Sequence, residues 1–154
     1  MLTSLQQSKI FAGLELQRLE TIWRRGRTAE FSPGDLVIEE GRPNDHLFVV
    51  LRGELEVFLP KTAARLTRIS IARVGPGDSI GEYSFLDDQP TSASVSAKAE
   101  TEVFKISQAE FEQTLNSDSA TGQVVYRNLL RLLVGRLRTE NQLLDLSTFA
   151  WTKR

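Results

Sequence analysis

Residues 33–57 read PGDLVIEEGRPNDHLFVVLRGELEV, and the spacing of their glycines predicts a series of short strands. The apolar residues 36–38 lie between Gly34 and Gly41, which places a strand between two turns. Residues 46–51 are almost continuously apolar, as is typical of a strand that is buried on both faces. Each glycine lies where a strand must reverse, and such turns often require a positive φ angle, which glycine adopts without strain.

The same pattern continues to about residue 106. A second Pro-Gly-Asp tripeptide at 76–78 repeats the one at 33–35 and again precedes a strand. Residues 93–99 alternate between small apolar and polar side chains, which predicts one more strand. Many short strands separated by turn residues indicate a sandwich or a jelly roll. We therefore expect a mainly β fold with flanking helices, in which residues 31–106 form a jelly-roll barrel.

Helices are expected before the barrel, in residues 1–30. Apolar residues recur there every three or four positions, which is the period of an amphipathic helix. Gly13 suggests a break between a short first helix and a main helix, and Gly26 is a suitable C-cap for the second.

Helices are also expected after the barrel, in residues 107–154. Ser107 and Glu110 have the spacing of a capping box, which marks the start of a helix. A polar turn then leads into a longer helix over about residues 121–146. A length of 154 residues fits one domain, so we expect a single domain spanning residues 1–154.

The long helix carries two apolar stripes. A helix that is apolar on two sides needs two partners. We expect the barrel to cover one stripe and the same helix of a second subunit to cover the other, which gives a twofold homodimer. The alternative is a helix buried wholly within one chain. The first stripe consists of Leu130, Leu133, Leu137 and Leu144, and the second of Val125, Leu129 and Leu132.

The amino-acid inventory argues against catalysis. The chain has no cysteine, and His46 is its only histidine. Thiolate nucleophiles and metal sites built from several histidines are therefore excluded. We interpret His46 as structural, and we expect neither enzymatic activity nor a bound metal or cofactor.

Charge and hydropathy limit the partners. A formal net charge of -1 argues against a dedicated nucleic-acid binder. Only residues 147–154 follow the long helix, which is too short a segment for a helix-turn-helix, so we expect no direct DNA binding. No apolar run approaches the roughly 18 residues that span a membrane, and the first residues do not read as a signal peptide. We expect a cytoplasmic protein that does not enter membranes.

Residues 33–57 together with residues 75–90, GPGDSIGEYSFLDDQP, resemble the cyclic nucleotide-binding domain family. This family includes the catabolite activator protein and the regulatory subunits of cyclic-AMP-dependent protein kinase. The resemblance implies that Gly81 and Glu82 open a phosphate-binding cassette, in which the glutamate accepts a hydrogen bond from the ribose 2′-hydroxyl. It also implies that backbone amides at the start of a short helix, including Tyr83 and Ser84, face the cyclic phosphate.

The resemblance fails at the cation. Family members that bind cyclic nucleotides place an arginine just after the cassette, and this chain has Thr91 there, followed by Ser92. A hydrogen bond between charged groups contributes roughly 1.5–3 kcal/mol. Leaving the phosphate without its partner in a desolvated site costs about 2–5 kcal/mol, which would weaken micromolar binding to roughly millimolar. The two hydroxyls can bind an oxygen atom but cannot neutralise its charge, so we expect ordinary cAMP binding to be weak or lost.

Three functions remain open for a stand-alone regulatory or sensor domain. In the first, the cassette binds another small molecule. In the second, it binds a cyclic nucleotide with an arginine from elsewhere, such as Arg73, Arg131 or an arginine of the second subunit. In the third, the domain is a ligand-free dimeric interaction module. Asn141 on the long helix has two open roles: it reads a purine edge, or it sets the register of a dimer seam. In each case we expect a protein effector downstream.

Overall fold

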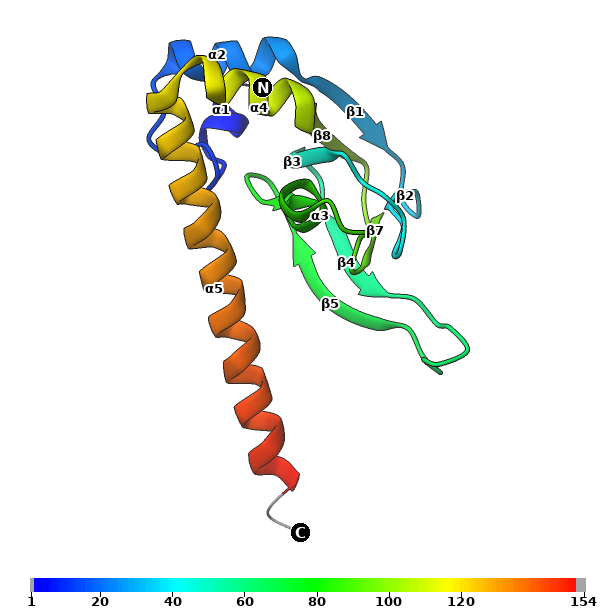
Figure 1. Ribbon diagram of the computed structural model, residues 1–154. Helices are drawn as coiled ribbons and strands as arrows, with labels where there is room; N and C mark the ends of the chain where they lie inside the picture. The colour runs from blue at the N-terminus through cyan, green and yellow to red at the C-terminus, as the bar shows by residue number, and fades with distance from the viewer. Residues whose placement is uncertain (1, 152–154) are drawn as a thin grey trace.

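The computed structural model describes residues 2–151, and the side chains of residues 3–142. Its strands are β1 (Arg27–Phe31), β2 (Leu36–Ile38), β3 (His46–Arg52), β4 (Leu55–Leu59), β5 (Ile69–Val74), β6 (Ser79–Ile80), β7 (Ser94–Ala97) and β8 (Thr101–Ser107). They form two antiparallel sheets, in the orders β1-β8-β3-β6 and β2-β7-β4-β5. The expected jelly roll with flanking helices is therefore confirmed (Figure 1).

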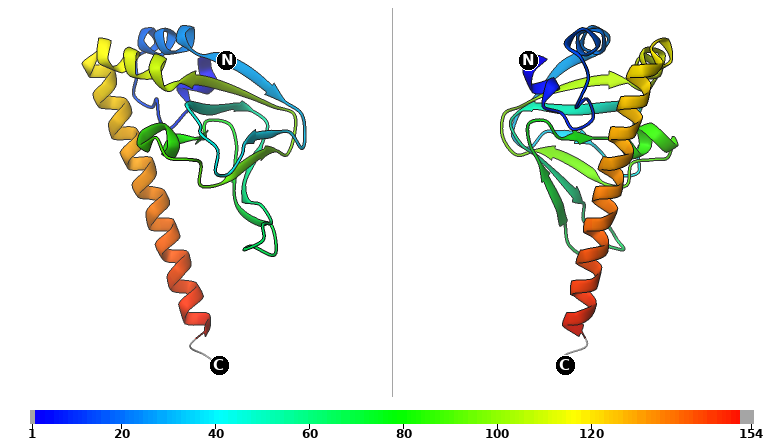
Figure 2. Two further views of the ribbon diagram at one scale, coloured as in Figure 1. Left: turned by 45° about the vertical axis from the view of Figure 1, so that its right-hand side comes forward. Right: turned by 90° about the vertical axis from the view of Figure 1, so that its left-hand side faces the viewer.

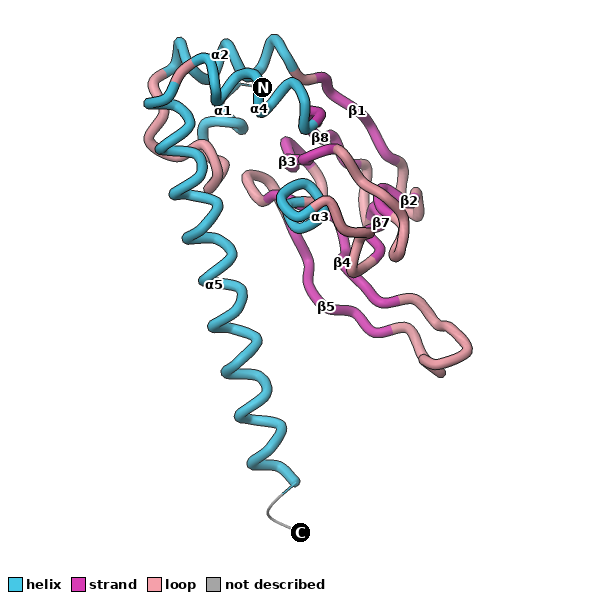
Figure 3. Tube along the Cα trace, viewed as in Figure 1, coloured by secondary structure: helices cyan, strands magenta, loops and turns pink. Residues whose placement is uncertain are grey.

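The helices lie outside this barrel. They are α1 (Leu2–Gln6), α2 (Leu16–Arg25), α3 (Glu82–Asp87), α4 (Gln108–Ser117) and α5 (Ser119–Trp151). Figure 3 shows α1, α2 and α4 gathered at one end of the molecule, while α3 interrupts the strands of the barrel. The long helix α5 starts at this helical end, runs past α3 and continues well beyond it (Figure 2).

The strand β3 explains why the barrel has two cores. Its odd-numbered residues Leu47, Val49 and Leu51 pack against the helices, in a core that also contains Phe104 of β8. Its even-numbered residues Phe48 and Val50 pack between the two sheets. Because side chains of a strand alternate between its faces, a strand buried on both sides must be apolar at nearly every position, as the sequence predicted.

The N-terminal helical region is shorter than the sequence suggested. The helix α2 ends at Gly26, whose N–H donates to the carbonyl oxygen of Ile22 at 3.2 Å, so the expected C-cap is confirmed. The expectation of helix through residue 30 was wrong, because residues 27–31 form β1 and pair with β8. The requirement for glycine at the junction is steric, since a Cβ atom at Gly26 would lie 2.2 Å from the ring of Phe104.

Only half of the predicted capping box forms at the start of α4. The Ser107 side chain accepts a hydrogen bond from the Glu110 backbone N–H at 3.3 Å. The Glu110 carboxylate accepts instead from Arg25 of α2 at 3.0 Å. The residue that was expected to complete a local cap thus joins two helices that lie far apart in sequence.

The two apolar stripes of α5 have different surroundings. Val125 and Leu129 are fully or almost fully buried in the core beneath the helices. Leu130 and Leu137 are 63% and 57% exposed. Among the described side chains, the side of α5 with Val125 and Leu129 is therefore covered within the chain and the side with Leu130 and Leu137 is exposed, which agrees with the two-sided helix predicted from the sequence. Leu133, which was predicted to lie in the same stripe as Leu130, is half-buried. Leu144, which belongs to the same predicted stripe, lies outside the described side chains.

Candidate functional site

The turn before α3 can be made only by glycine. Gly81 has a φ angle of 86° and occupies the N-cap position of α3. A Cβ atom there would lie 2.7 Å from the carbonyl oxygen of His46 and 2.8 Å from Nδ2 of Asn44. Both the backbone angle and the close approach of neighbouring atoms exclude a larger residue, so Gly81 fixes where the helix α3 begins.

Glu82 is the first residue of α3, and its side chain is almost completely buried, at 2% exposure. Arg136 of α5 donates to both of its carboxylate oxygens, each at 3.0 Å. The hydroxyl of Ser79 donates to the same carboxylate, and Arg136 also donates to the Ser79 carbonyl oxygen at 3.0 Å. A buried carboxylate requires such compensation, and Arg136 provides the neutralising charge.

Arg136 remains cationic in this environment. Burial alone would lower the pKa of Arg136, but the charge of Glu82 and the hydrogen bonds to it raise the pKa above its usual range. The guanidinium also lies 5.9 Å from the ring centroid of Tyr83, within the distance of a cation–π contact. The structure thus places a permanent cation beside Glu82.

Sequence reasoning did not select Arg136. It named Arg73 and Arg131 as possible sources of charge, but Arg73 donates to Glu54 at 3.1 Å, and Arg131 lines a pocket on the outer face of α5. A signal for Arg136 was present, since the buried stripe Val125, Leu129, Leu132 continues to position 136 at the same spacing of three and four residues.

Thr91 and Ser92, the residues at the expected arginine position, have different environments. Thr91 is buried, and its hydroxyl donates to the carbonyl oxygens of Glu39 and Arg42. Its backbone also bonds the same loop, through contacts with Gly41 and Arg42. Ser92 is exposed. The Thr91 hydroxyl therefore holds the β2–β3 loop in place rather than facing open space.

The other expected site residues are divided among separate surfaces. Tyr83 is partly exposed beside Arg136, whereas Ser84 is buried and lines a cleft of about 440 Å³ on another side of α3. Asn141 is exposed on α5. It lies five residues beyond Arg136, which corresponds to about 7.5 Å along the helix axis. The structure therefore joins Glu82 and α5 directly, and it places Asn141 further along the helix.

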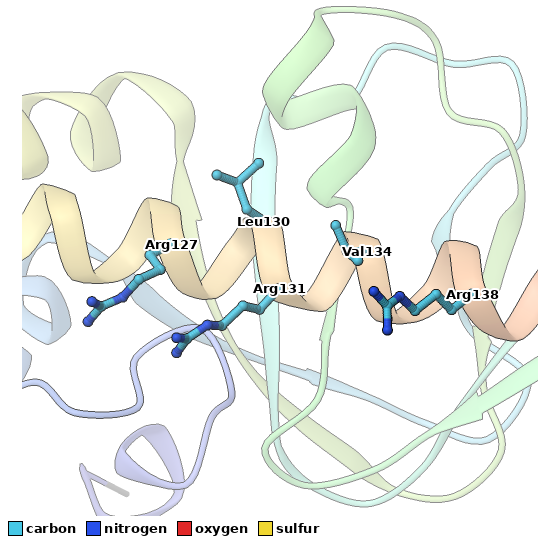
Figure 4. A pocket seen from close by; sticks show the side chains of 6 residues that line it. Arg127, Leu130, Arg131, Val134 and Arg138 are labelled. Atoms are coloured by element: carbon cyan, nitrogen blue, oxygen red, sulfur yellow. The ribbon is translucent and has the colours of Figure 1, made fainter.

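A second feature of α5 is a shallow pocket of about 360 Å³ on its uncovered face. Figure 4 shows Arg127 and Arg131 extending together on one side of this pocket and Leu130 and Val134 on the other. Apolar residues rimmed by charged ones are typical of surfaces that contact other proteins.

The described residues hold no group of three or more His, Asp or Glu side chains placed to bind a metal ion. His46 contacts Asp45 instead, with 2.6 Å between Nδ1 and a carboxylate oxygen. Within the described part of the chain, no helix is both long and apolar enough to cross a membrane.

Comparison with known proteins agrees with this geometry. Residues 28–118 match the cyclic nucleotide-binding domain, and the chain therefore belongs to this family. It is 32% identical, over 143 residues, to the CRP-like cAMP-activated global transcriptional regulator of Mycobacterium tuberculosis. That similarity covers 92% of this chain and 61% of the regulator.

Solved structures show the same fold. The chain superimposes on the catabolite activator protein of Thermus thermophilus with a TM-score of 0.80 and 26% identity, covering 92% of this chain and 64% of that one. A cyclic nucleotide-binding domain from Methylobacillus flagellatus gives a TM-score of 0.81 and 28% identity, with 94% and 80% covered. This chain spans less than two thirds of the length of the two regulators.

Proposed function

We propose that this chain is a regulatory or sensor domain that acts as a homodimer through α5, and whose cassette binds ordinary cAMP weakly or not at all. The observation that supports this most is the distribution of charge in the cassette. Its only buried carboxylate, among the described residues of α3, is already neutralised by Arg136. The position where the family carries an arginine is Thr91, whose hydroxyl is bound to backbone carbonyls.

Both the ribose and the phosphate of a cyclic nucleotide would bind unfavourably in this cassette. The ribose 2′-hydroxyl would have to share Glu82 with Arg136, and the phosphate would lack the cation that the family supplies. Leaving a buried charge without its partner weakens binding by about 2–5 kcal/mol, or roughly one and a half to three and a half decades of affinity. A less charged ligand would be less affected, so another small molecule remains compatible with the cassette.

A second candidate is a cyclic nucleotide receptor that uses Arg136 in place of the missing arginine. The supporting observation is that Arg136 is charged, half-buried and adjacent to Tyr83 and Glu82. To contact a phosphate, its guanidinium would have to share or leave Glu82, a carboxylate that is costly to leave unpaired. We therefore rank this candidate second.

The proposed dimer rests on the sequence and exposure of α5. Leu130, Val134, Leu137 and Asn141 follow one another at intervals of four, three and four residues, which is the repeat of a coiled-coil seam. All four are exposed. In this register Val134 and Asn141 share one seam position and the leucines the other, and a single Asn at such a position sets the register of two-stranded coiled coils. This favours the seam role of Asn141 over contact with a purine.

The output is proposed to pass through another protein, in the cytoplasm and without DNA contact by this segment. Net charge of -1 supports the last point. The relative from Mycobacterium tuberculosis is a transcriptional regulator, but it extends beyond the matching region. The coupling element we propose is α5, since it carries both the cassette contact at Arg136 and the exposed seam.

Isothermal titration with cAMP and cGMP tests this function. We expect no heat of binding at micromolar concentrations. Micromolar binding that disappears in Arg136→Met would support the receptor candidate instead. Micromolar binding that persists in Arg136→Met would contradict both candidates: the loss of cyclic nucleotide binding at Thr91 and the use of Arg136 as the replacement cation.

A further inference from the structure

A cleft of about 440 Å³ lies on the side of α3 that faces away from Arg136. Two residues along an α-helix turn the side chain by about 200°, so Glu82 and Ser84 point to opposite sides of α3. Glu82 meets Arg136 of α5, whereas Ser84 lines the cleft, together with Asn44 before β3 and Gln108 at the start of α4. The cleft is thus separate from the contact between the cassette and α5.

The charge of the cleft is negative. Asp45 and Asp88 line it, and no Lys or Arg does so. One oxygen of Asp45 contacts Nδ1 of His46 at 2.6 Å, and one oxygen of Asp88 accepts from Gln108 at 2.9 Å. Within the described part of the chain, neither carboxylate pairs with a lysine or an arginine. Each therefore keeps one oxygen available as an acceptor.

Ser84 provides an independent sign that the cleft receives a polar group. It is only 5% exposed, yet its hydroxyl has no hydrogen-bond partner among the described residues. No buried side-chain nitrogen or oxygen atom among the described residues lacks a partner, so the Ser84 oxygen itself is in contact with solvent. Because Ser84 lines the cleft, a ligand in the cleft could bind this hydroxyl.

The side-chain amide nitrogens of the cleft already donate within the chain, whereas each carboxylate keeps one free oxygen. The amide nitrogen of Gln108 donates to the carbonyl oxygen of Phe85 at 3.1 Å and to Asp88. The amide nitrogen of Asn44 donates to the carbonyl oxygen of His46 at 2.7 Å. The free groups are carboxylate oxygens and a hydroxyl, an arrangement that matches a cation with several N–H donors.

We propose that this cleft binds a guanidinium or primary ammonium group, supplied by a small organic cation or by an Arg or Lys side chain of a basic peptide. Asp45 and Asp88 neutralise the charge, and Ser84 accepts a hydrogen bond from it. Pro43 and Pro90 provide apolar surface for the aliphatic part that such cations carry. The proposal goes beyond the proposed function, because it concerns a different ligand on a different side of α3.

The test is a titration of the full ¹⁵N-labelled chain followed by NMR. The probes are agmatine, the capped tripeptide Gly-Arg-Gly, and the same tripeptide with citrulline, which keeps the shape of arginine without its charge. We expect saturable shifts of the backbone amides of Ser84, Asp88 and Gln108 with agmatine or the arginine peptide, in the millimolar range. The citrulline peptide should bind at least about tenfold more weakly.

Variants locate the effect. Asp45→Asn and Asp88→Asn should each weaken binding by about tenfold, whereas Glu112→Gln, which removes an exposed carboxylate of α4 away from the cleft, should not. Tighter binding of agmatine indicates a small-molecule ligand, and tighter binding of the peptide indicates a protein partner. Absence of saturable shifts with both cations up to tens of millimolar would overturn the proposal, as would equal binding of the citrulline peptide. The comparison of the arginine and citrulline peptides on the unmodified chain tests whether binding requires the positive charge, even if a variant does not fold.

Discussion

Arg136 of α5 binds both carboxylate oxygens of Glu82 at 3.0 Å, across 54 residues of sequence. This pair joins the long helix to the first residue of the cassette helix α3. A ligand that draws Glu82 away would release α5 at this point, and a movement of α5 would expose the Glu82 carboxylate. The pair is therefore the direct physical link between the candidate ligand site and the candidate dimer surface.

Replacing Arg136 should destabilise the protein more than expected for a partly exposed side chain. Arg136→Met leaves the carboxylate of Glu82 buried and unpaired, so we expect the free energy of unfolding to fall by about 3 kcal/mol. Urea denaturation followed by circular dichroism measures this change. The matched control is Arg138→Met, since Arg138 is exposed on the same helix, and it should change stability by less than about 0.5 kcal/mol.

A double-mutant cycle measures the coupling energy between Glu82 and Arg136, apart from what each residue contributes alone. Glu82→Gln removes the charge that Arg136 neutralises, so Glu82→Gln combined with Arg136→Met should lose less stability than the sum of the two single changes, by about 1–3 kcal/mol. Strictly additive losses would show that the two residues are not coupled in solution.

Substitution by alanine should lower stability by different amounts at two glycines that have nearly equal φ angles. Gly13 has φ 85° and open space around its Cβ position, whereas Gly81 has φ 86° and backbone oxygen at 2.7 Å. Gly13→Ala should lower stability by about 1 kcal/mol for the backbone conformation alone. Gly81→Ala should lower it by a further 1–3 kcal/mol, roughly, because neighbouring atoms must move. Equal losses in thermal denaturation would contradict the close packing at Gly81.

Asp78, just before β6, gives the stability a pH dependence. Burial alone would raise the pKa of Asp78, but hydrogen bonds from Lys9 and from the backbone of Gly75, with the nearby charges of Lys9 and Arg136, hold it below its usual range. The unfolded chain therefore takes up a proton at higher pH than the folded one. The stabilisation is complete above the unfolded pKa of about 4 and is lost as the pH falls through the folded pKa.

The measurement is urea denaturation between neutral pH and pH 3. Asp78→Asn should be less stable than the unmodified protein at neutral pH, and the difference should shrink as the pH falls. A difference that stays constant over this range would show that the Asp78 carboxylate contributes no linked stability.

The exposed seam of α5 should control assembly. Introducing lysines with Leu130→Lys and Leu137→Lys places like charges across the proposed dimer interface, so sedimentation should show a monomer with unchanged helical content. Leu66→Lys is a suitable control, because Leu66 is 81% exposed on the loop between β4 and β5. A monomeric unmodified protein, or a dimer that survives both lysines, would contradict this part of the proposal.

The sequence was sufficient for the barrel because its signals are local. Glycines at strand reversals and the continuous apolar run of β3 follow from turn geometry and from burial on both faces. The boundary at Gly26 was harder to predict, since the extent of β1 depends on pairing with β8, whose paired residues lie seventy or more positions away. The register between two distant strands cannot be predicted from the sequence of either strand alone.

The site was harder to predict for the same reason. Gly81 and Glu82 could be selected from a local motif, but the partner of Glu82 comes from another element. Thr91 was identified as the position that lacks a cation, yet its hydrogen bonds to the carbonyls of Glu39 and Arg42 depend on how two loops pack. Local patterns identified the residues that open the cassette. The stripe of α5 places position 136 on the buried side, but only the packing of α5 shows that Arg136 is the partner of Glu82.

The central claim is that the missing cation at Thr91 limits cyclic nucleotide binding. It is tested most directly by calorimetric titration of Thr91→Arg with cAMP, beside the unmodified protein and Ser92→Arg, which adds the same charge one residue further on. We predict that Thr91→Arg binds cAMP about tenfold to a thousandfold more tightly than the unmodified protein. We predict no such gain for Ser92→Arg. Tight binding by the unmodified protein, or no gain in Thr91→Arg while its fold is intact, would contradict the claim.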